Sequence, residues 1–233
     1  MTRSGGSPKW GENVTERSRC GLALLLAAAI MAFALSEPRA EPAERTTAAA
    51  PIARVIQQRG EVEVRRNDAE LSSHLGRLLY EGDSVVTGAA GRVLLEFTDR
   101  SLLALGSRTE VRLDDYRVEG AVGSLKGLLT LLGGILRMSI VQSTKAEDFS
   151  IRTQTAIASA RSTDWIVEAQ PSETTVFVVS GGVTVADAAR GASVRLSAGE
   201  GTSVTGAAAD SPAAPEIWGA KRAADALSRT GRE

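Results

Sequence analysis

The sequence predicts an all-β fold, twisted and solenoid-like or sandwich-like, followed by a short C-terminal helix. From Ile52 onward, short runs of Val, Ile, Leu and Thr alternate with polar residues at the two-residue period of a strand. Gly-, Asp- and Ser-rich turns separate these runs at intervals of about 8 to 15 residues, which leaves little room for helices. With 233 residues, 43% of them hydrophobic, the chain can fill a core of ordinary size.

The first residues predict export. Arg17 and Arg19 precede an uncharged run, Cys20 to Leu35, which is shorter than the ~20 apolar residues of a membrane-spanning helix. Small residues follow it, so we expect a signal peptide over residues 1–36, cleaved between about Ala34 and Ala40. The alternative is an uncleaved anchor, which would be the only membrane contact.

The rest of the chain divides by composition. Residues 37–51 are rich in Pro, Ala and charge, and read as a linker. The all-β domain is expected over 52–206 and an Ala/Pro-rich tail over 207–233. The one cysteine, Cys20, lies before the apolar run, so the exported chain would have no thiol for a disulfide or for catalysis.

Alternation assigns an inner face to four of the runs. Val62 and Val64 face the core, whereas Glu61 and Glu63 face water. The run Leu102–Leu105 is apolar on both faces, as in a strand that is covered on both sides. Three further sets are each expected on one inner face: Val93, Leu95 and Phe97; Thr109, Val111 and Leu113; and Val183 and Val185.

The segment Ser124–Val141 fits either a buried helix or a pair of strands bent at Gly133–Gly134. Two adjacent glycines cost a helix roughly 2 kcal/mol relative to alanine, which favours strands.

The tail carries a weak helical pattern after Pro215. It places Ile217, Lys221, Ala224 and Leu227 on one side of a short helix that docks through Trp218; the alternative is a frayed terminus.

The ordered motifs from residue 53 to about 205 resemble those of FecR-type domains. The motifs are Gly60-x-Val62-x-Val64, "LLYEGDSVVTGAAGRVLLEFTDRSLLALGSRTEVRL", "GGILR", "FSIRTQTAIASARSTDWIV", "VFVVSGGVTV" and "VRLSAGEGTSV". The resemblance implies an all-β FecR domain that works in the periplasm without catalysis. The best-known members relay the state of an outer-membrane receptor through a membrane helix to a cytoplasmic anti-sigma region. Here only about 20 residues precede the apolar run, too few for such a region to fold, so we expect a stand-alone FecR domain.

Two turns depart from the family pattern. The usual Asp-Gly-Ser is Asp99-Arg100-Ser101, and the usual Arg-Gly-Thr is Arg161-Ser162-Thr163. Because glycine is absent from both, we expect neither turn to require a positive φ.

Seven residues are candidate signature or binding residues. Gly82, Asp83 and Thr87 read as a turn that begins a strand, with Asp83 bonded to nearby amides. The others belong to the stretch that best matches the family, where they either line a binding surface or serve the core, with Trp165 buried and Arg161 paired with an acid. These are Arg161, Thr163, Asp164 and Trp165.

No catalytic residue, metal site or cofactor is predicted. His74 is the only histidine and has no acidic or thiol partner nearby in the sequence. Asp114–Asp115 reads as a solvated turn, since a hard cation needs about six oxygens. The "GEG" of residues 199–201 lacks the Lys-Ser/Thr of a phosphate-binding loop.

The expected function is therefore that of a non-enzymatic, periplasmic binding or signal-sensing module, which contacts an envelope protein or polysaccharide through exposed sheet edges. A net charge of -1 without a basic tract argues against nucleic acid. Two alternatives stay open. One is a structural or assembly protein of the envelope, suggested by the repeated Gly-x-Val-x-Val units of "GEVEV" and "GGVTV"; the other is an envelope hydrolase that uses the carboxylates Asp164 and Glu168.

Overall fold

The computed structural model describes residues 50–67, 69–119, 124–140, 145–206 and 212–231. The chain separates into two units, Met1–Thr47 and Ala48–Glu233, and all described residues belong to the second unit. The expected signal peptide lies outside the described residues. No helix in the described part of the chain is long and apolar enough to cross a bilayer.

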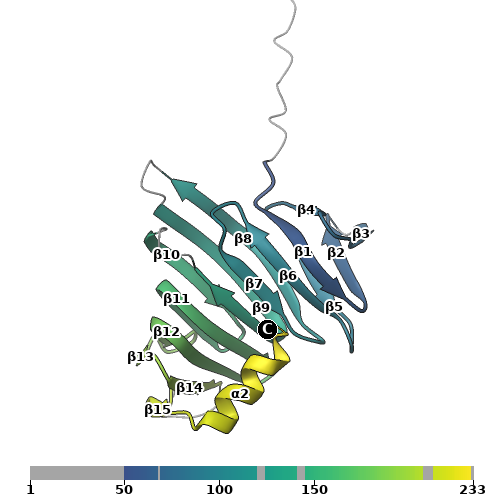
Figure 1. Ribbon diagram of the computed structural model, residues 1–233. Coiled ribbons are helices and arrows are strands. Elements are labelled where there is room, and N and C mark those ends of the chain that lie inside the picture. The colour runs from purple at the N-terminus through teal and green to yellow at the C-terminus, as the bar shows by residue number, and fades with distance from the viewer. Residues whose placement is uncertain (1–49, 68, 120–123, 141–144, 207–211, 232–233) are drawn as a thin grey trace, which may run out of the picture. The chain divides into compact units, whose positions relative to one another are not determined.

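Strands make up most of the described chain, with one short helix near its end, which confirms the all-β fold class (Figure 1). The elements are β1 (Ala53–Arg59), β2 (Val62–Arg66), β3 (Ala69–Ser72), β4 (Leu78–Leu79), β5 (Ser84–Thr87), β6 (Arg92–Phe97), β7 (Leu102–Leu105), β8 (Glu110–Glu119), β9 (Ser124–Ser139), β10 (Lys145–Arg152), β11 (Ala156–Gln170), β12 (Glu173–Asp187), β13 (Ser193–Ser197), β14 (Glu200–Thr205), β15 (Glu216–Ile217) and α2 (Ala220–Arg229).

The strands form one continuous sheet that folds back on itself into two layers. Layer 1 has the order β3-β2-β5-β8-β9-β10-β11-β12-β13. Layer 2 has the order β4-β1-β6-β7-β9-β11-β12-β14-β15. The long strands β9, β11 and β12 run through both layers and join them.

Each shared strand bends where it passes between the layers. β9 bends at Gly134, which has φ +91°, and β12 bends near Gly181, which has φ +87°. β11 carries register shifts between Arg161 and Trp165. The strand conformation predicted for Ser124–Val141 is found, but the prediction of two separate strands is wrong. The segment contains one kinked strand, because its glycines bend β9 without ending it.

The core fills the space between the layers. All the residues expected on inner faces are buried, including Val62 and Val64 of β2. Four aromatic rings follow one another through this core. Phe97 stacks on Tyr116 at a centroid distance of 4.0 Å, Tyr116 meets the Phe149 ring edge-on at 6.1 Å, and Phe149 meets Trp165 edge-on at 5.8 Å.

The hydroxyl of Tyr116 is the polar end of this aromatic chain. It donates a hydrogen bond to Asp99 Oδ1 at 2.7 Å. Burial, together with the negative charge of Asp99, raises the pKa of Tyr116, so the phenol stays protonated and keeps donating.

Helix α2 covers part of the outer face of layer 2. Its Ala223, Ala226 and Leu227 pack with Ile135, Ile166 and Phe177 of the sheet, and Trp218 stacks on Phe177 at 4.5 Å. The predicted docking through Trp218 is thus confirmed, but the predicted face is wrong. Ile217 lies in β15, because the helix begins only at Ala220. Lys221 and Ala224 are exposed, since the helix packs through Ala223, Ala226 and Leu227 instead.

Candidate functional site

The residues Gly82, Asp83 and Thr87 surround β5 and hold it in the fold. Gly82 has φ +87°, so the turn before the strand does require the left-handed region. The Asp83 carboxylate is fully buried and accepts a hydrogen bond from the Tyr80 N–H at 2.9 Å, which confirms its bonding to a nearby amide. It also accepts bonds from Arg66 Nε at 2.7 Å and Nη2 at 2.8 Å. This bidentate pair raises the pKa of the guanidinium.

Thr87 ends the same strand inside a network of buried hydroxyls. Its Oγ1 donates to the Gly106 carbonyl at 2.6 Å and accepts from the Thr109 N–H at 2.9 Å. Thr109 Oγ1 in turn lies 3.1 Å from the Ile135 carbonyl and 3.0 Å from the Ile135 nitrogen. These contacts fasten β5 and β8 to the kinked strand β9.

The second predicted group lies at the bend of β11. Trp165 is fully buried in the core, and Thr163 Oγ1 donates to the Gly182 carbonyl at 3.0 Å. The side chain of Arg161 lies outside the described residues, so its pairing with an acid stays a prediction. Within the described residues no hydrogen bond joins this group to the group around β5, and the two do not form one site.

The carboxylates Asp164 and Glu168 face outward on layer 2, and each meets an arginine. Asp164 accepts bonds from Arg137 Nε at 2.9 Å and Nη2 at 2.7 Å, and Glu168 forms an ion pair with Arg229 of α2. Two carboxylates engaged in this way are poorly placed to act as a general acid and a nucleophile.

The remaining polar residues considered in the sequence are exposed or paired with neighbours. His74 is exposed, and its Nδ1 lies 3.0 Å from the Leu75 carbonyl. Asp114 pairs with Arg112, and Asp115 pairs with Arg117. Among the described residues, no three His, Cys, Asp or Glu side chains gather where a metal ion could be held.

The outer face of layer 1 is not covered by a helix in the described part of the chain, and over β10–β13 it is lined by hydroxyls and arginines. Ser150, Ser159, Thr184 and Arg195 lie in register across these four strands. Arg152 lies one outward position along β10 from Ser150. We call these five residues the open face.

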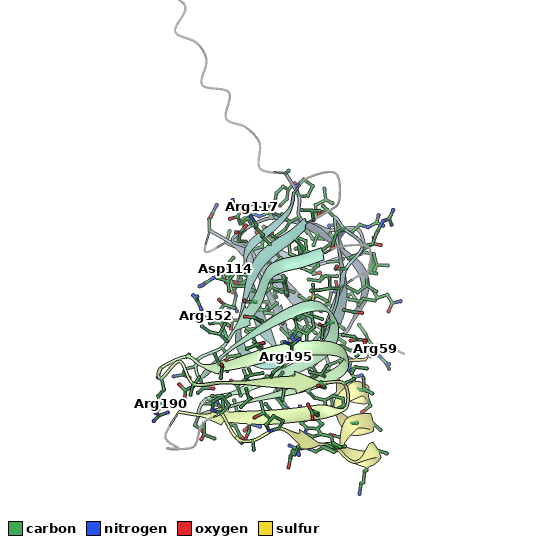
Figure 2. All side chains as sticks on the ribbon, turned by 90° about the vertical axis from the view of Figure 1, so that its left-hand side faces the viewer. Arg59, Asp114, Arg117, Arg152, Arg190 and Arg195 are labelled. Atoms are coloured by element: carbon green, nitrogen blue, oxygen red, sulfur yellow. The ribbon has the colours of Figure 1, made fainter. Side chains whose placement is uncertain are left out.

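The two arginines of the open face, Arg152 and Arg195, are exposed, and neither forms an ion pair with a described residue (Figure 2). The other half of the layer differs, because its charges are matched across neighbouring strands. There Arg65 lies near Glu63, Glu70 and Glu110. The open face therefore combines hydrogen-bonding hydroxyls with two arginines that have no ion-pair partner among the described residues.

Strand β13 forms the free edge of the same half. Within the described residues it pairs only with β12. Beyond the strand, the Asp187 N–H donates to the Ala192 carbonyl at 2.8 Å, and the Ser197 N–H donates to Glu200 Oε2 at 2.7 Å. Because bonded and non-bonded residue pairs alternate in an antiparallel ladder, the backbone groups of Ser193, Arg195 and Ser197 point away from β12. Glu200 occupies the Ser197 N–H, so we call the outward groups of Ser193 and Arg195, together with the Ser197 carbonyl, the open edge.

The other sheet edges are shorter or partly occupied. At β3, Arg77 Nη2 donates to the Ser72 carbonyl at 2.6 Å. At β14, the Ala213 N–H donates to the Ser203 carbonyl at 2.9 Å, and β15 pairs with the start of the strand. Residues 115–119 of β8 also pair on one side only, with β9. β13 is the longest described strand whose whole length is unpaired on one side, so we take the open edge as the candidate docking strand.

Reasoning from the sequence missed both Arg195 and the partner of Asp83. The five letters "SVRLS" do carry an alternating pattern, with Val194 and Leu196 turned inward and Arg195 outward. A run of five residues does not show whether its strand lies at the edge of a sheet. The pairing of Arg66 with Asp83 could not be predicted either, because the two residues belong to separate strands.

A family model described as "FecR protein" matches residues 83–184. The chain therefore contains a FecR domain over β5 to most of β12, as the motifs predicted. Two crystal structures of a candidate anti-sigma factor from Parabacteroides distasonis are similar to the chain, each with 17% identity and a TM-score of 0.48. Each match covers 62% of this chain and 64% or 63% of that one, so the chain spans less than two thirds of that protein's length. No curated protein is significantly similar to the chain.

Proposed function

We propose that the chain is a non-enzymatic, periplasmic signal-sensing module of the FecR type, which binds an extended segment of an envelope protein along the open edge of β13. The observation that carries this proposal is the row of outward backbone groups at Ser193 and Arg195, together with the Ser197 carbonyl. Such a row can accept one more antiparallel or parallel strand through backbone hydrogen bonds. The FecR domain at residues 83–184 supports a regulatory role.

The side chains around the open edge select the partner segment. A docked strand would place alternate side chains on the open face, beside Arg195 and Thr184, and the others over Val194 and Leu196. An acidic residue opposite Arg195 would neutralise its charge, which has no ion-pair partner among the described residues. The preferred partner is therefore an extended segment in which an acidic residue alternates with apolar ones.

Export is part of the proposal. It is supported by the basic residues Arg17 and Arg19 ahead of the apolar run, and by the absence of any thiol after Cys20. The absence of catalysis is supported by the engagement of Asp164 and Glu168 with arginines.

The test uses two substitutions at one residue. Arg195→Pro removes an N–H that points away from β12, so it blocks an added strand while leaving the β12–β13 ladder in place. Arg195→Thr removes the same charge and keeps the N–H. With the wild-type chain as bait in envelope extract, we expect a captured protein that is lost with Arg195→Pro and retained, at reduced yield, with Arg195→Thr. Equal capture by the wild type and Arg195→Pro would contradict docking at the open edge.

A polysaccharide is the second candidate, favoured by the hydroxyls of the open face and by its two arginines, which form no ion pair with a described residue. In that case Arg195→Thr and Arg152→Thr would each weaken binding to an acidic envelope glycan, and Arg195→Pro would weaken it no more than Arg195→Thr.

Self-assembly would use the same edge, with β13 of one copy paired to β13 of another. Light scattering of the purified chain distinguishes it, because a monodisperse monomer contradicts an assembly role.

A further inference from the structure

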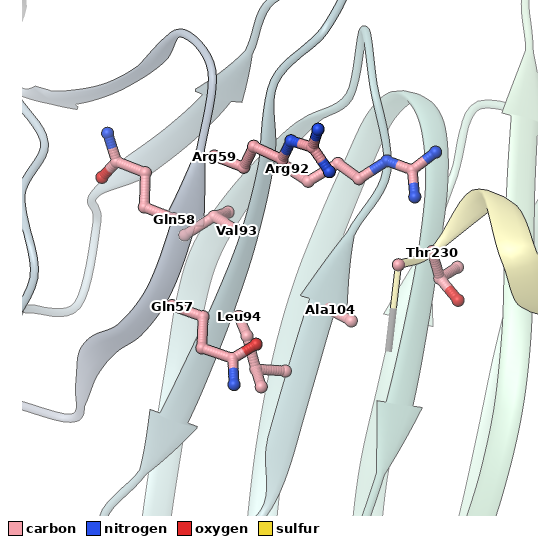
Figure 3. Close-up of a pocket in the computed structure, with 9 residues that line it drawn as sticks. Gln57, Gln58, Arg59, Arg92, Val93, Leu94, Ala104 and Thr230 are labelled. Atoms are coloured by element: carbon pink, nitrogen blue, oxygen red, sulfur yellow. The ribbon is translucent and has the colours of Figure 1, made fainter. Parts of the chain in front are cut away.

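A cavity of about 250 Å³ lies on the outer face of layer 2, beside the C-terminal end of α2. β1, β6 and β7 provide its floor and one wall, and Thr230 and Gly231 provide the other wall (Figure 3). The lining residues are Gln57, Gln58, Arg59, Arg92, Val93, Leu94, Ala104, Thr230 and Gly231. No acidic residue is among them.

Two arginines lie directly opposite each other in this cavity. Arg59 of β1 and Arg92 of β6 are cross-strand partners, and their side chains extend in the same direction over the sheet, toward Thr230 (Figure 3). Like charges at facing positions of an antiparallel pair destabilise a sheet. A fold that keeps such a pair without an acid in the cavity carries a positive charge that a ligand can neutralise.

The two arginines are not equivalent. Arg92 Nη1 donates to the Ser228 carbonyl at 3.0 Å, so the negative end of the α2 dipole partly compensates its charge. Its side chain also packs on Gly231, where a Cβ would lie 2.8 Å from Arg92 Cδ. Arg59 makes no hydrogen bond or ion pair with a described residue. Arg92 is thus held in place by the helix end, and Arg59 is free to turn toward an anion.

We propose that this cavity binds a small hydroxylated organic acid through its carboxylate. A carboxylate is planar and can accept two parallel bonds from a guanidinium, which suits Arg59. The Gln57 amide lies on the same outer face, where it can bond to hydroxyls. Leu94 and Ala104, in register with Gln57, give an apolar floor for C–H groups. The volume is near the lower limit for small-molecule sites, which matches a ligand the size of one sugar acid.

Occupation of this cavity would connect α2 to β1. The ligand would contact Arg59 on one side, and Arg92 together with the helix end at Thr230 and Gly231 on the other. Binding to the folded state alone stabilises it by mass action, so the ligand would fix the helix end on the sheet. This site lies on layer 2 and does not depend on the open edge of β13.

The test is calorimetric titration of the purified chain with glucuronate, with glucose as the neutral probe of matched size. We expect glucuronate to bind and glucose not to bind. Arg59→Gln should weaken glucuronate binding by about tenfold or more, because the bidentate contact is lost. Arg117→Gln, which makes the same change of charge at an exposed arginine of β8 on layer 1, is the matched control and should leave binding unchanged.

The folding of the variant is checked by its thermal midpoint without ligand. Arg59→Gln removes the repulsion from Arg92, so its midpoint should equal or exceed that of the wild type at low salt. Arg59→Lys keeps the charge without the planar fork and should bind with intermediate affinity.

Three results would overturn the proposal. One is the absence of glucuronate binding to the wild type, and another is equal binding to the wild type and Arg59→Gln. The third is tighter binding of inorganic phosphate than of glucuronate, which would make the cavity a phosphate site.

Discussion

At the scale of single residues, Arg100 departs from what the sequence led us to expect. It occupies the glycine position of the Asp99-Arg100-Ser101 turn, and the lack of glycine predicted that no positive φ is required. Arg100 has φ +73°, so this prediction is wrong. The reason lies in its neighbours: Asp99 accepts bonds from the Ser101 N–H at 3.0 Å and Oγ at 2.7 Å, while Arg100 N–H bonds the Phe97 carbonyl at 3.0 Å. These bonds impose the left-handed conformation on whichever residue lies between Asp99 and Ser101.

Replacement of Arg100 by glycine should therefore stabilise the fold. We expect Arg100→Gly to raise the free energy of unfolding by about 1 kcal/mol relative to Arg100→Ala, because only glycine adopts this φ without strain. Both variants lose the ion pair with Glu96, in which the Arg100 side chain is 73% exposed and contributes little. Urea unfolding of the two variants is the measurement. A glycine variant no more stable than the alanine variant would show that the turn is unstrained.

At the scale of elements, Gly133 and Gly134 are adjacent in β9 but have different roles. Gly134 has φ +91°, and a Cβ there would lie 2.4 Å from Thr109 Oγ1 and 2.5 Å from the Arg108 carbonyl. A Cβ at Gly133 would meet no atom within 4 Å. The kink at Gly134 brings the backbone of Ile135 against the Thr109 hydroxyl and turns β9 from one layer into the other. The sequence predicted a bend at this pair, and the tertiary structure assigns it to the second glycine.

The two glycines form a matched pair of substitutions. Gly134→Ala should lower the free energy of unfolding by about 3 kcal/mol or more, because it combines an unfavourable φ with a collision against Arg108 and Thr109, just before β8. Gly133→Ala should change it by less than about 1 kcal/mol. Guanidinium denaturation of both variants measures the difference. Equal destabilisation would mean that the bend is shared by the two residues.

The strands agree with the sequence better than the helix does. Each predicted alternation of inner and outer residues holds in the structure, as at Val93, Leu95 and Phe97. The two-residue period shows which residues of a strand share a face without any knowledge of its neighbours. The buried face of α2 is decided by contacts with distant strands, because Ala223, Ala226 and Leu227 pack with Ile135, Ile166 and Phe177.

At the scale of the whole molecule, the shared strands β9, β11 and β12 make the two layers one cooperative unit. Neither layer can lose these strands without opening the core of the other, and the aromatic chain from Phe97 to Trp165 joins both. We expect equilibrium unfolding in a single transition. The Trp218→Phe variant leaves Trp165 as the reporter within the described residues, and its fluorescence midpoint should coincide with the midpoint from far-UV circular dichroism. Two separate midpoints would mean that the layers unfold independently.

The sequence by itself determined the all-β class, the inner faces of the strands with a clear alternation, and the FecR-type motifs; it left the docking of the tail through Trp218 open against a frayed terminus. These features follow from local periodicity or from ordered motifs, which can be recognised without knowledge of distant contacts. Only the tertiary structure decided which edge stays unpaired, which arginine meets Asp83, and that Arg59 faces Arg92 without an acid in their cavity. Such features depend on strand order and register between segments far apart in the chain, and a period of two residues carries no information about which strands become neighbours.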